Sequence, residues 1–275
     1  MAESRHVVVD DIRTHYLEAG SGPTVVLLHG GAPGDCAEAS WERNVEQLAT
    51  RFRVLAPDWI GFGETDKVRD FSDPLGKPVR HLARLLETLR VGEAAFVGLS
   101  MGGTLLVRDA ASEQPRLPAR KLVLVSGGGF SPDNDARRSV QSYDGTIESM
   151  RAIVRAVHAD PSFAEDDEFV SRRQTWSLLP GAFEHFRSLG LRPPAGPGAT
   201  PFGAADPTPY EHVSIPTLIT AGADDPLREP GYADELGGRI PGSRVVVFEP
   251  CGHVPNLEHA DTWNDLVLDF LSEEA

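Results

Sequence analysis

A serine between two glycines is the first feature of this sequence that could carry out chemistry. Ser100 follows Gly98 and precedes Gly102, after an apolar run at 94–97 and before a helix-forming run at 104–111. This Gly-x-Ser-x-Gly pattern is typical of a sharp turn from strand to helix, which leaves the hydroxyl exposed at the bend. A serine hydroxyl becomes a nucleophile only when a base takes its proton and an acid orients that base. Ser100 therefore predicts a histidine and a carboxylate elsewhere in the chain.

Candidates for the base and the acid occur late in the sequence. His253 stands in Cys-Gly-His shortly after an apolar run at 244–248, and Asp224 and Asp225 come shortly after another apolar run at 217–221. An isolated histidine is more often a core residue, but this position after a strand and a glycine favours a reactive role for His253. Either aspartate could orient the histidine.

The elements that must position these residues can be read from short apolar runs that do not alternate with polar residues. Such runs are typical of strands buried on both faces, as in a parallel sheet covered by helices. A β-hairpin at 6–18 comes first, and six runs follow it: 24–28, 53–56, 94–97, 121–126, 217–221 and 244–248. Helical patterns between them, at 41–50 with Ser40 as the N-cap, 79–89, 104–111, 231–239 and 262–271, complete an α/β fold.

Functional groups of such sheets lie on loops at the carboxyl ends of the strands. His29, Asp58, Ser100, Asp225 and His253 all occupy such positions. We interpret His29 and Asp58 as residues that brace these loops. The remaining histidines show no metal-ligand spacing, and the glycines at 127–129 lack the context of a phosphate-binding loop, so no metal is expected.

Residues 130–209 interrupt the alternation of strand and helix. This stretch has helical patches at 146–158 and 165–179 but no strand-like run, and it ends in a Pro- and Gly-rich connector at 192–209. An insertion of this length between two strands is more typical of a lid than of a linker. We therefore expect a core built from 1–129 and 210–275 and a helical cap built from 130–209.

Charge and composition restrict the partners. The formal net charge of −15 and the pI of about 5.0 argue against nucleic acid and anionic membranes as partners. The order of serine, carboxylate and histidine on strand-end loops favours a small-molecule substrate instead. No apolar run approaches the length of a membrane span, and the N-terminus lacks the apolar region of a secretory signal, so we expect a cytoplasmic protein. Cys36 and Cys251 could form a disulfide only if their loops meet.

Together, the glycine-flanked Ser100, the loop His29-Gly30-Gly31, the acid loop at 222–225 and the Gly-His pair at 252–253 resemble the α/β-hydrolase superfamily. The resemblance covers nearly the whole chain. It implies an eight-stranded, mostly parallel sheet with a helical cap inserted after the sixth strand. It also implies a Ser100–Asp225–His253 triad, with Asp224 as the second choice for the acid. The backbone N–H groups of Gly31 and Met101 would form the oxyanion hole.

Within that superfamily the sequence is similar to the meta-cleavage product hydrolases, which cleave a C–C bond of ring-opened aromatic dienoates without a cofactor. The similarity rests on the segments 29–34, 100–103, 121–130 and 251–271. In that family a lid arginine binds the dienoate carboxylate, and spacing from Pro180 gives Arg172 as its counterpart. Dimerisation is common among these relatives, so a homodimer is one state that the resemblance allows.

Three positions that shape the dienoate pocket depart from that family. Ser40 and Leu99 stand where the family has asparagine, and Val254 stands where it has tryptophan. These replacements favour a less polar or differently shaped substrate, which makes a carboxylesterase the main alternative. A cofactor-free perhydrolase and a non-catalytic ligand sensor are the other readings. Haloalkane dehalogenases and epoxide hydrolases are excluded, because they need an aspartate where this chain has Ser100.

Overall fold

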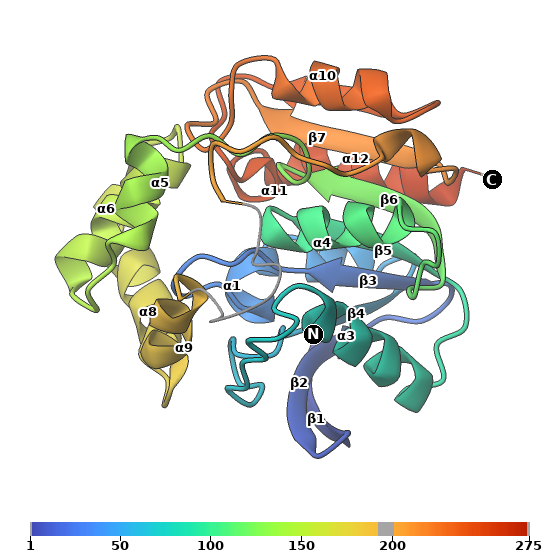
Figure 1. Cartoon of the computed structure of the whole chain (residues 1–275), viewed down its shortest axis with the longest axis horizontal. Helices are drawn as coiled ribbons and strands as arrows, with labels where there is room; N and C mark the ends of the chain where they lie inside the picture. Colours follow the sequence, from blue (N-terminus) through green and yellow to red (C-terminus); the bar gives the residue numbers. More distant parts are fainter. Residues whose placement is uncertain (1, 192–200, 274–275) are drawn as a thin grey trace.

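A computed structural model describes residues 2–191 and 201–273, and one eight-stranded sheet runs through its centre (Figure 1). The strand order is β1-β2-β4-β3-β5-β6-β7-β8, in which β2 is antiparallel to β1 and to β4, and all other pairs are parallel. The strands are β1 (Glu3–Val9), β2 (Ile12–Ala19), β3 (Thr24–Leu28), β4 (Arg53–Pro57), β5 (Ala94–Leu99), β6 (Ala119–Val125), β7 (Thr217–Gly222) and β8 (Arg244–Phe248). The predicted hairpin and all six apolar runs are confirmed as strands.

The central strands are largely apolar because both of their faces are covered. In β3, Val25 and Leu27 pack into one hydrophobic core, whereas Val26 and Leu28 pack into the other. Helices α3 (Gly76–Thr88), α4 (Met101–Ala110) and α10 (Tyr232–Arg239) contribute to the core that contains Val26. Helices α1 (Ala37–Trp41), α2 (Val45–Leu48), α11 (Pro255–Glu258) and α12 (Ala260–Ser272) contribute to the core that contains Val25. This two-sided burial makes the sheet a rigid platform for the loops at its strand ends.

The helix predicted at 41–50 is wrong in its extent. The chain forms two short helices there, α1 and α2, and the N-cap of α1 is Cys36, while Ser40 lies inside that helix. The interruption coincides with Asn44, which is buried and donates from Nδ2 to the carbonyl of Asn256 and to Oδ1 of Asn264, both at 2.9 Å. These contacts to α11 and α12 hold the Asn44 backbone outside the helical conformation.

A group of helices inserted between β6 and β7 forms the cap at one end of the sheet (Figure 1). It contains α5 (Asp135–Gln141), α6 (Ile147–Val157), α7 (Ser162–Glu165), α8 (Asp167–Ser177) and α9 (Ala182–Leu189), and a 3₁₀ turn at Tyr210–His212 leads back to β7. The cap has its own small hydrophobic core around Met150, Ile153 and Phe169. Residues 192–200 of the predicted connector lie outside the described residues. The division of the chain at 130 and 209 stays a prediction.

Two further expectations can be compared with the described residues. Cys36 and Cys251 are both buried and free, so they form no disulfide. Among residues 2–191 and 201–273, none of the helices has the length and apolar character needed to cross a bilayer.

Candidate active site

Ser100 lies at the junction of β5 and α4 with a φ of 51°, a conformation that residues with a Cβ rarely adopt. The glycines beside it allow this turn because the backbone segments almost touch. A Cβ added to Gly98 would lie 2.5 Å from the nitrogen of Gly103, and a Cβ on Gly102 would lie 2.4 Å from the carbonyl oxygen of Leu28. The sequence pattern therefore has a direct steric cause, and it places the serine hydroxyl at the end of β5.

The structure brings Ser100, His253 and Asp225 into one chain of hydrogen bonds. Nε2 of His253 lies 2.9 Å from Oγ of Ser100, and Nδ1 of His253 lies 2.7 Å from Oδ2 of Asp225. The other oxygen of Asp225 accepts the backbone N–H of Leu227 at 2.9 Å. Asp224, the second choice for the acid, instead accepts the backbone N–H of Cys251. Because the Asp225 carboxylate can only accept, it favours the tautomer that leaves Nε2 free to take the serine proton.

Asp225 is suited to stay ionised in this arrangement. Burial by itself would raise the pKa of the Asp225 carboxyl, but the adjacent His253 and the Arg228 guanidinium outweigh that effect and lower it. An ionised, buried carboxylate stabilises the positive charge that develops on the imidazole when it accepts a proton. The three side chains can therefore activate a hydroxyl for attack on a carbonyl carbon.

Gly31 lies directly against Met101, the residue after the serine. A Cβ on Gly31 would come within 2.7 Å of the Met101 sulfur, and one on Gly30 would lie 3.6 Å from Cβ of Ser100. Among the described residues, the backbone N–H groups of Gly31 and Met101 have no hydrogen-bond acceptor. Two free N–H groups beside a serine hydroxyl are the arrangement that can stabilise an oxyanion.

The side chain of His29 stabilises the loop that carries Gly31 through two hydrogen bonds. Nε2 of His29 accepts the backbone N–H of Trp59 at 2.9 Å, and Nδ1 donates to the carbonyl of Gly30 at 2.7 Å. Burial lowers the pKa of His29, which keeps the ring neutral and able to accept at Nε2. His29 thus has the bracing position expected from the sequence.

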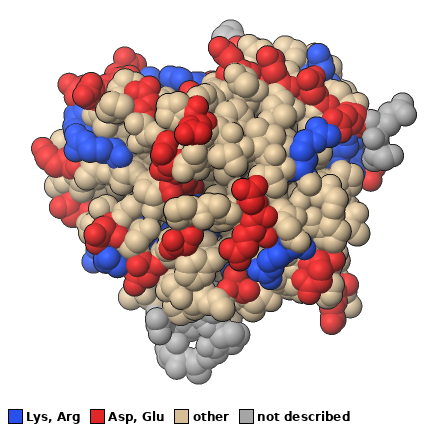
Figure 2. All heavy atoms as spheres, turned by 90° about the horizontal axis from the view of Figure 1, so that it is seen from above, with Lys and Arg blue, Asp and Glu red and all other residues tan. Residues whose placement is uncertain are grey.

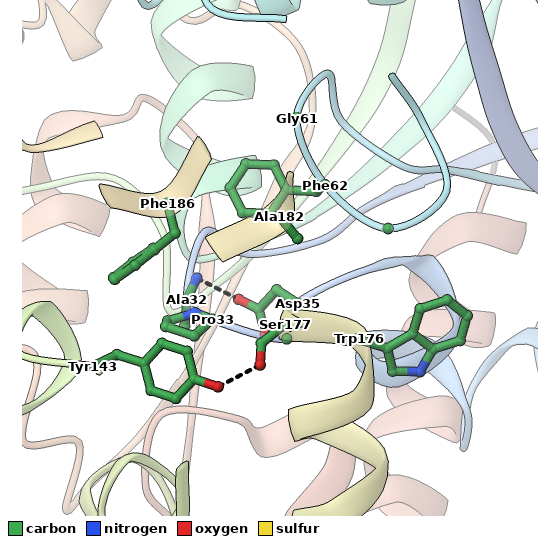
Figure 3. A pocket seen from close by; sticks show the side chains of 12 residues that line it. Ala32, Pro33, Asp35, Gly61, Phe62, Tyr143, Trp176, Ser177, Ala182 and Phe186 are labelled. Atoms are coloured by element: carbon green, nitrogen blue, oxygen red, sulfur yellow. Dashed lines mark hydrogen bonds between the residues drawn. The ribbon is translucent and has the colours of Figure 1, made fainter. Parts of the chain in front are cut away.

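The same loop is braced from the cap by an ion pair that the sequence did not reveal. Asp35 accepts the backbone N–H of Ala32 at 2.8 Å and pairs with Arg173 of α8 at 2.7 Å, and both side chains are buried. Figure 3 shows Asp35 and Ala32 facing a small pocket between this loop and the cap, where the hydroxyls of Tyr143 and Ser177 are hydrogen-bonded. The cap and the loop of Gly31 are therefore mechanically connected.

A second Ser–His–Asp chain occurs at the edge of the sheet. Oγ of Ser4 lies 3.0 Å from Nε2 of His15, and Nδ1 of His15 lies 2.7 Å from Oδ2 of Asp58. Asp58 also accepts the backbone N–H groups of Ala37 and Glu64, so it braces two loops as expected. Ser4 lies within β1, not at a glycine-flanked turn, and it does not line the large cavity described below. Of these two chains among the described residues, the one at Ser100 combines a serine hydroxyl with free backbone donors and a neighbouring cavity.

Ser100 and His253 line a cavity of about 760 Å³ between the core and the cap. The predicted pocket residues Ser40, Leu99 and Val254 line it too.

The assignment of Arg172 is wrong: its side chain is half exposed, does not line the cavity, and pairs with Glu42 and Glu168 on the surface. The next residue of α8, Arg173, lines the cavity instead. Successive residues of a helix point about 100° apart, so an error of one position changes the face completely.

The cavity differs in charge from the rest of the molecule. The chain has a formal net charge of −15, and Figure 2 shows Asp and Glu side chains spread over the face seen from above. The cavity, in contrast, is lined by seven Lys or Arg and three Asp side chains: Arg69, Lys77, Arg108, Arg137, Arg173, Arg187 and Arg228, and Asp35, Asp70 and Asp206. This excess of positive charge favours an anionic ligand.

The described residues contain no cluster of three or more His, Cys, Asp or Glu side chains placed to hold a metal ion.

A mainly parallel eight-stranded sheet with a serine turn after β5 and an inserted helical cap defines a hydrolase of the α/β-hydrolase fold. The chain belongs to the Alpha/beta hydrolase family, whose profile matches residues 25–266. The predictions of the fold and of a hydrolase are thereby confirmed.

Several relatives are named as hydrolases of hydroxy-oxo-dienoates or of a related semialdehyde. The chain is 30% identical over 273 residues to 2-hydroxymuconate semialdehyde hydrolase of Pseudomonas sp. strain CF600, covering 98% of this chain and 94% of that protein. It is 31% identical to 2-hydroxy-6-oxo-2,4-heptadienoate hydrolase of Pseudomonas putida F1, covering 98% and 96%. A solved structure of the meta-cleavage product hydrolase CumD from Pseudomonas fluorescens IP01 superimposes with a TM-score of 0.85 at 28% identity, covering 97% and 96%.

Proposed function

We propose that this chain is a serine hydrolase that cleaves the C–C bond of a 2-hydroxy-6-oxo-2,4-dienoate, a product of aromatic ring fission. The observation that carries the proposal is the hydrogen-bonded chain of Ser100, His253 and Asp225 opening into a cationic cavity. The names of the two curated relatives and of the CumD structure support the same reaction class.

In the proposed reaction, the Ser100 hydroxyl or a water molecule activated by His253 adds to the carbonyl next to the scissile bond. His253 takes the proton as the new C–O bond forms, and Asp225 stabilises the resulting imidazolium. The negative charge on the carbonyl oxygen is stabilised by the N–H groups of Gly31 and Met101. Before attack, the 2-hydroxydienoate is converted to its keto form, in which the hydroxyl proton is lost and C5 gains a proton. Collapse of the tetrahedral intermediate then breaks the bond between C5 and C6, and the electron pair leaves with C5 as a dienolate, which His253 protonates. Where Ser100 is the nucleophile, a water molecule activated by His253 hydrolyses the acyl ester and releases the carboxylic acid.

Arg173 is the cap residue best placed to attract the dienoate carboxylate. It lines the cavity, and its Nε is buried without a partner among the described residues, although its Nη2 is paired with Asp35. A guanidinium can donate two parallel hydrogen bonds to a carboxylate. Arg173 thus takes the role that the sequence had suggested for Arg172.

Carboxylester hydrolysis is the second candidate function. Leu99 and Val254 give part of the cavity wall an apolar character, and the same nucleophile and base would serve for an ester. In an ester the leaving group is an alkoxide, so the substrate does not have to be converted to a keto form before cleavage.

The decisive experiment compares 2-hydroxy-6-oxo-2,4-heptadienoate, followed by loss of its yellow absorbance, with p-nitrophenyl butyrate. We expect kcat/KM for the dienoate to exceed that for the ester by at least about 100-fold, because only the anionic substrate uses the cationic cavity. Equal values, or a preference for the ester, would exclude C–C hydrolysis as the main activity. Absence of turnover on both, with stoichiometric dienoate binding, would indicate a ligand sensor.

A further inference from the structure

Arg228 is a buried cation to which the proposed reaction assigns no step. It follows the candidate acid Asp225 by three residues and is 6% exposed. The Asp225 carboxylate pairs with His253 at 2.7 Å, and Arg228 forms no ion pair among the described residues. A buried charge is costly unless hydrogen bonds compensate it, so the contacts of Arg228 show what it stabilises.

The guanidinium of Arg228 binds the segment in which the chain leaves β6 for the cap. Nε and Nη2 both donate to the carbonyl of Ser126, at 3.1 and 2.6 Å. Nη1 donates to the carbonyl of Phe130 at 3.2 Å and to the hydroxyl of Ser131 at 3.1 Å. Ser126 has a φ of 49°, a conformation that residues with a Cβ rarely adopt. Arg228 therefore holds a strained turn and the five residues after it.

Asp225 and Arg228 belong to one tight turn. The backbone N–H of Arg228 donates to the carbonyl of Asp225 at 3.3 Å, and the backbone N–H of Leu227 donates to the Asp225 carboxylate at 2.9 Å. The carboxylate must also stay within hydrogen-bonding distance of Nδ1 of His253. The position of this turn therefore decides the geometry of the triad, and Arg228 connects the turn to the end of β6.

The first helix of the cap holds the same turn from another direction. Asn134, the N-cap of α5, donates from Nδ2 to the carbonyl of Pro226 at 2.8 Å. Arg137 of α5 donates from Nη2 to the carbonyl of Leu227 at 2.8 Å. Both bonds end on the backbone of the turn, whereas Arg228 reaches from the turn to residues 126–131. The loop of the candidate acid is thus fixed between the cap and the sheet.

The charge of Arg228 acts on Asp225 as well. Burial would raise the pKa of the Asp225 carboxyl, whereas first His253 and then Arg228 lower it below its ordinary value. An arginine keeps its charge over the whole pH range in which enzymes work, while the charge of an imidazole changes with pH. Arg228 therefore supplies a positive charge at Asp225 that does not depend on the protonation of His253.

Other charged or titratable groups lie near Asp225. Burial raises the pKa values of Tyr232 and Cys251, so both are neutral at pH 7. Burial, and then the charge of Arg228, lower the pKa of Arg137 to about 10, so Arg137 is positive at pH 7. Asp224 is exposed and accepts the backbone N–H of Cys251. These groups stay in place when Arg228 is replaced.

We propose that Arg228 is a positioning residue for the triad: it joins the turn of Asp225 to the segment after β6, holds the carboxylate against His253, and keeps a permanent positive charge beside it. This inference rests on the proposed function only for the roles of Ser100, His253 and Asp225. It applies equally to a dienoate and to an ester, because both would use the same base and acid.

The test compares Arg228→Gln and Arg228→Lys on 2-hydroxy-6-oxo-2,4-heptadienoate and on p-nitrophenyl butyrate. We expect Arg228→Gln to lower kcat about 10- to 100-fold on each substrate that wild type cleaves, with KM changed less than about threefold. The acid limb of the pH profile of kcat/KM should move to higher pH by about half a pH unit or more. Without the cation, the pair of Asp225 and His253 takes up a proton more easily.

Arg228→Lys separates the charge from the hydrogen bonds. A lysine keeps the positive charge but cannot reproduce the fork of a guanidinium. Its acid limb should stay where it is in wild type, and its kcat should lie between those of wild type and Arg228→Gln. If Arg228→Gln does not fold, Arg228→Lys still decides, because a kcat equal to that of wild type would overturn the positioning role.

Arg239→Gln is the matched control. Arg239 also donates to a backbone carbonyl, that of Thr208 at 2.9 Å, and lies 4.6 Å from the ring centre of Tyr210, as Arg228 lies 5.0 Å from that of Tyr232. It does not line the cavity. Its replacement should leave kcat and the pH profile unchanged. The proposal is overturned by an equal loss in Arg239→Gln, by an unmoved acid limb in Arg228→Gln, or by a kcat of Arg228→Gln within about threefold of wild type.

A readout without turnover separates this proposal from the proposed function. The proton between Nδ1 of His253 and Asp225 should give a low-field ¹H NMR signal in the free protein, which persists in Arg239→Gln and is lost in Arg228→Gln. If wild type cleaves only the ester, the C–C hydrolase proposal fails and the ester still tests Arg228. If wild type cleaves neither compound, the signal decides: its loss in Arg228→Gln supports the positioning role, and its persistence there overturns it.

Discussion

The backbone N–H of His253 donates to the carbonyl of Val157 at 2.7 Å, so the candidate base is tied to the last residue of cap helix α6. The approach is so close that a Cβ on Gly252 would lie 2.5 Å from the same carbonyl oxygen. The loop that carries His253 therefore depends on the cap as well as on β8. A shift of the cap would move the imidazole relative to Ser100.

Glu258 strengthens this connection. Its Oε1 accepts the backbone N–H of Gly252 at 2.8 Å, and its Oε2 accepts those of Ala159 and Asp160 at 2.8 and 3.0 Å. An amide in its place can accept with only one oxygen and would direct its NH₂ group at the other donors. We predict that Glu258→Gln lowers kcat about tenfold or more with little change in KM, because small misplacements of a catalytic group are costly.

Glu42→Gln is the control for that prediction. Glu42 also connects the core to the cap, through Arg172 at 3.3 Å, but it does not touch the loop of His253. It should leave kcat within about twofold, since exposed ion pairs contribute little. A similar loss of kcat in both variants would contradict the prediction. So would a loss of kcat in Glu258→Gln that is explained by a lower unfolding temperature, because Glu258 would then act on stability and not on the position of His253.

Ser100→Ala should reduce turnover of either substrate class by at least about 1000-fold, because it removes the hydroxyl hydrogen-bonded to His253, and the members of such a triad act as one unit. Ser4→Ala removes the hydroxyl of the other Ser–His–Asp chain and should leave turnover unchanged. Steady-state rates and thermal unfolding of both variants test this pair. Activity that survives in Ser100→Ala but not in Ser4→Ala would assign the chemistry to the sheet edge.

Arg173→Gln and Arg172→Gln should differ strongly, although the two residues are adjacent. Removing Arg173 leaves Asp35 buried without its cation and loosens the loop of Gly31, so kcat/KM should fall about 100-fold or more for dienoates and also for neutral esters. Arg172→Gln removes only surface pairs and should stay within about twofold. Kinetics on both substrates check the prediction, and equal effects of the two variants would contradict it.

His158 should make the protein sensitive to acid. Burial, and to a smaller extent the charges of Arg173 and His253, lower its pKa from 6.5 to about 3, while its ring stacks on Phe163. Between about pH 3 and pH 6.5, His158 therefore binds a proton in the unfolded chain but not in the folded chain. The free energy of unfolding therefore falls as pH drops through this window, by up to about 1.4 kcal/mol per pH unit.

His158→Phe should remove that dependence without loss of packing. The carbonyl of Val154, which accepts from Nδ1 of His158, also accepts its backbone N–H, so the substitution leaves no acceptor unpaired. Urea unfolding between about pH 7 and pH 4 should show a flatter slope for the variant than for wild type. Parallel slopes would mean that other groups account for the acid sensitivity.

The sequence by itself determined the strands of the sheet and the sharp turn that carries Ser100, the candidate nucleophile. Continuous apolar runs such as 24–28 can be buried only between two layers of helices, and the glycines around Ser100 fit only a turn in which backbones touch. These features depend on neighbours in the chain, which is why they could be predicted without coordinates.

Only the tertiary structure decided which polar groups meet. Asp224 and Asp225 are adjacent, yet only Asp225 is hydrogen-bonded to His253. Arg172 and Arg173 are adjacent too, yet only Arg173 lines the cavity. The contacts of Glu258 with residues 159 and 160 join segments about a hundred residues apart. Such pairings are set by the packing of the cap on the sheet, and no local pattern in the sequence encodes them.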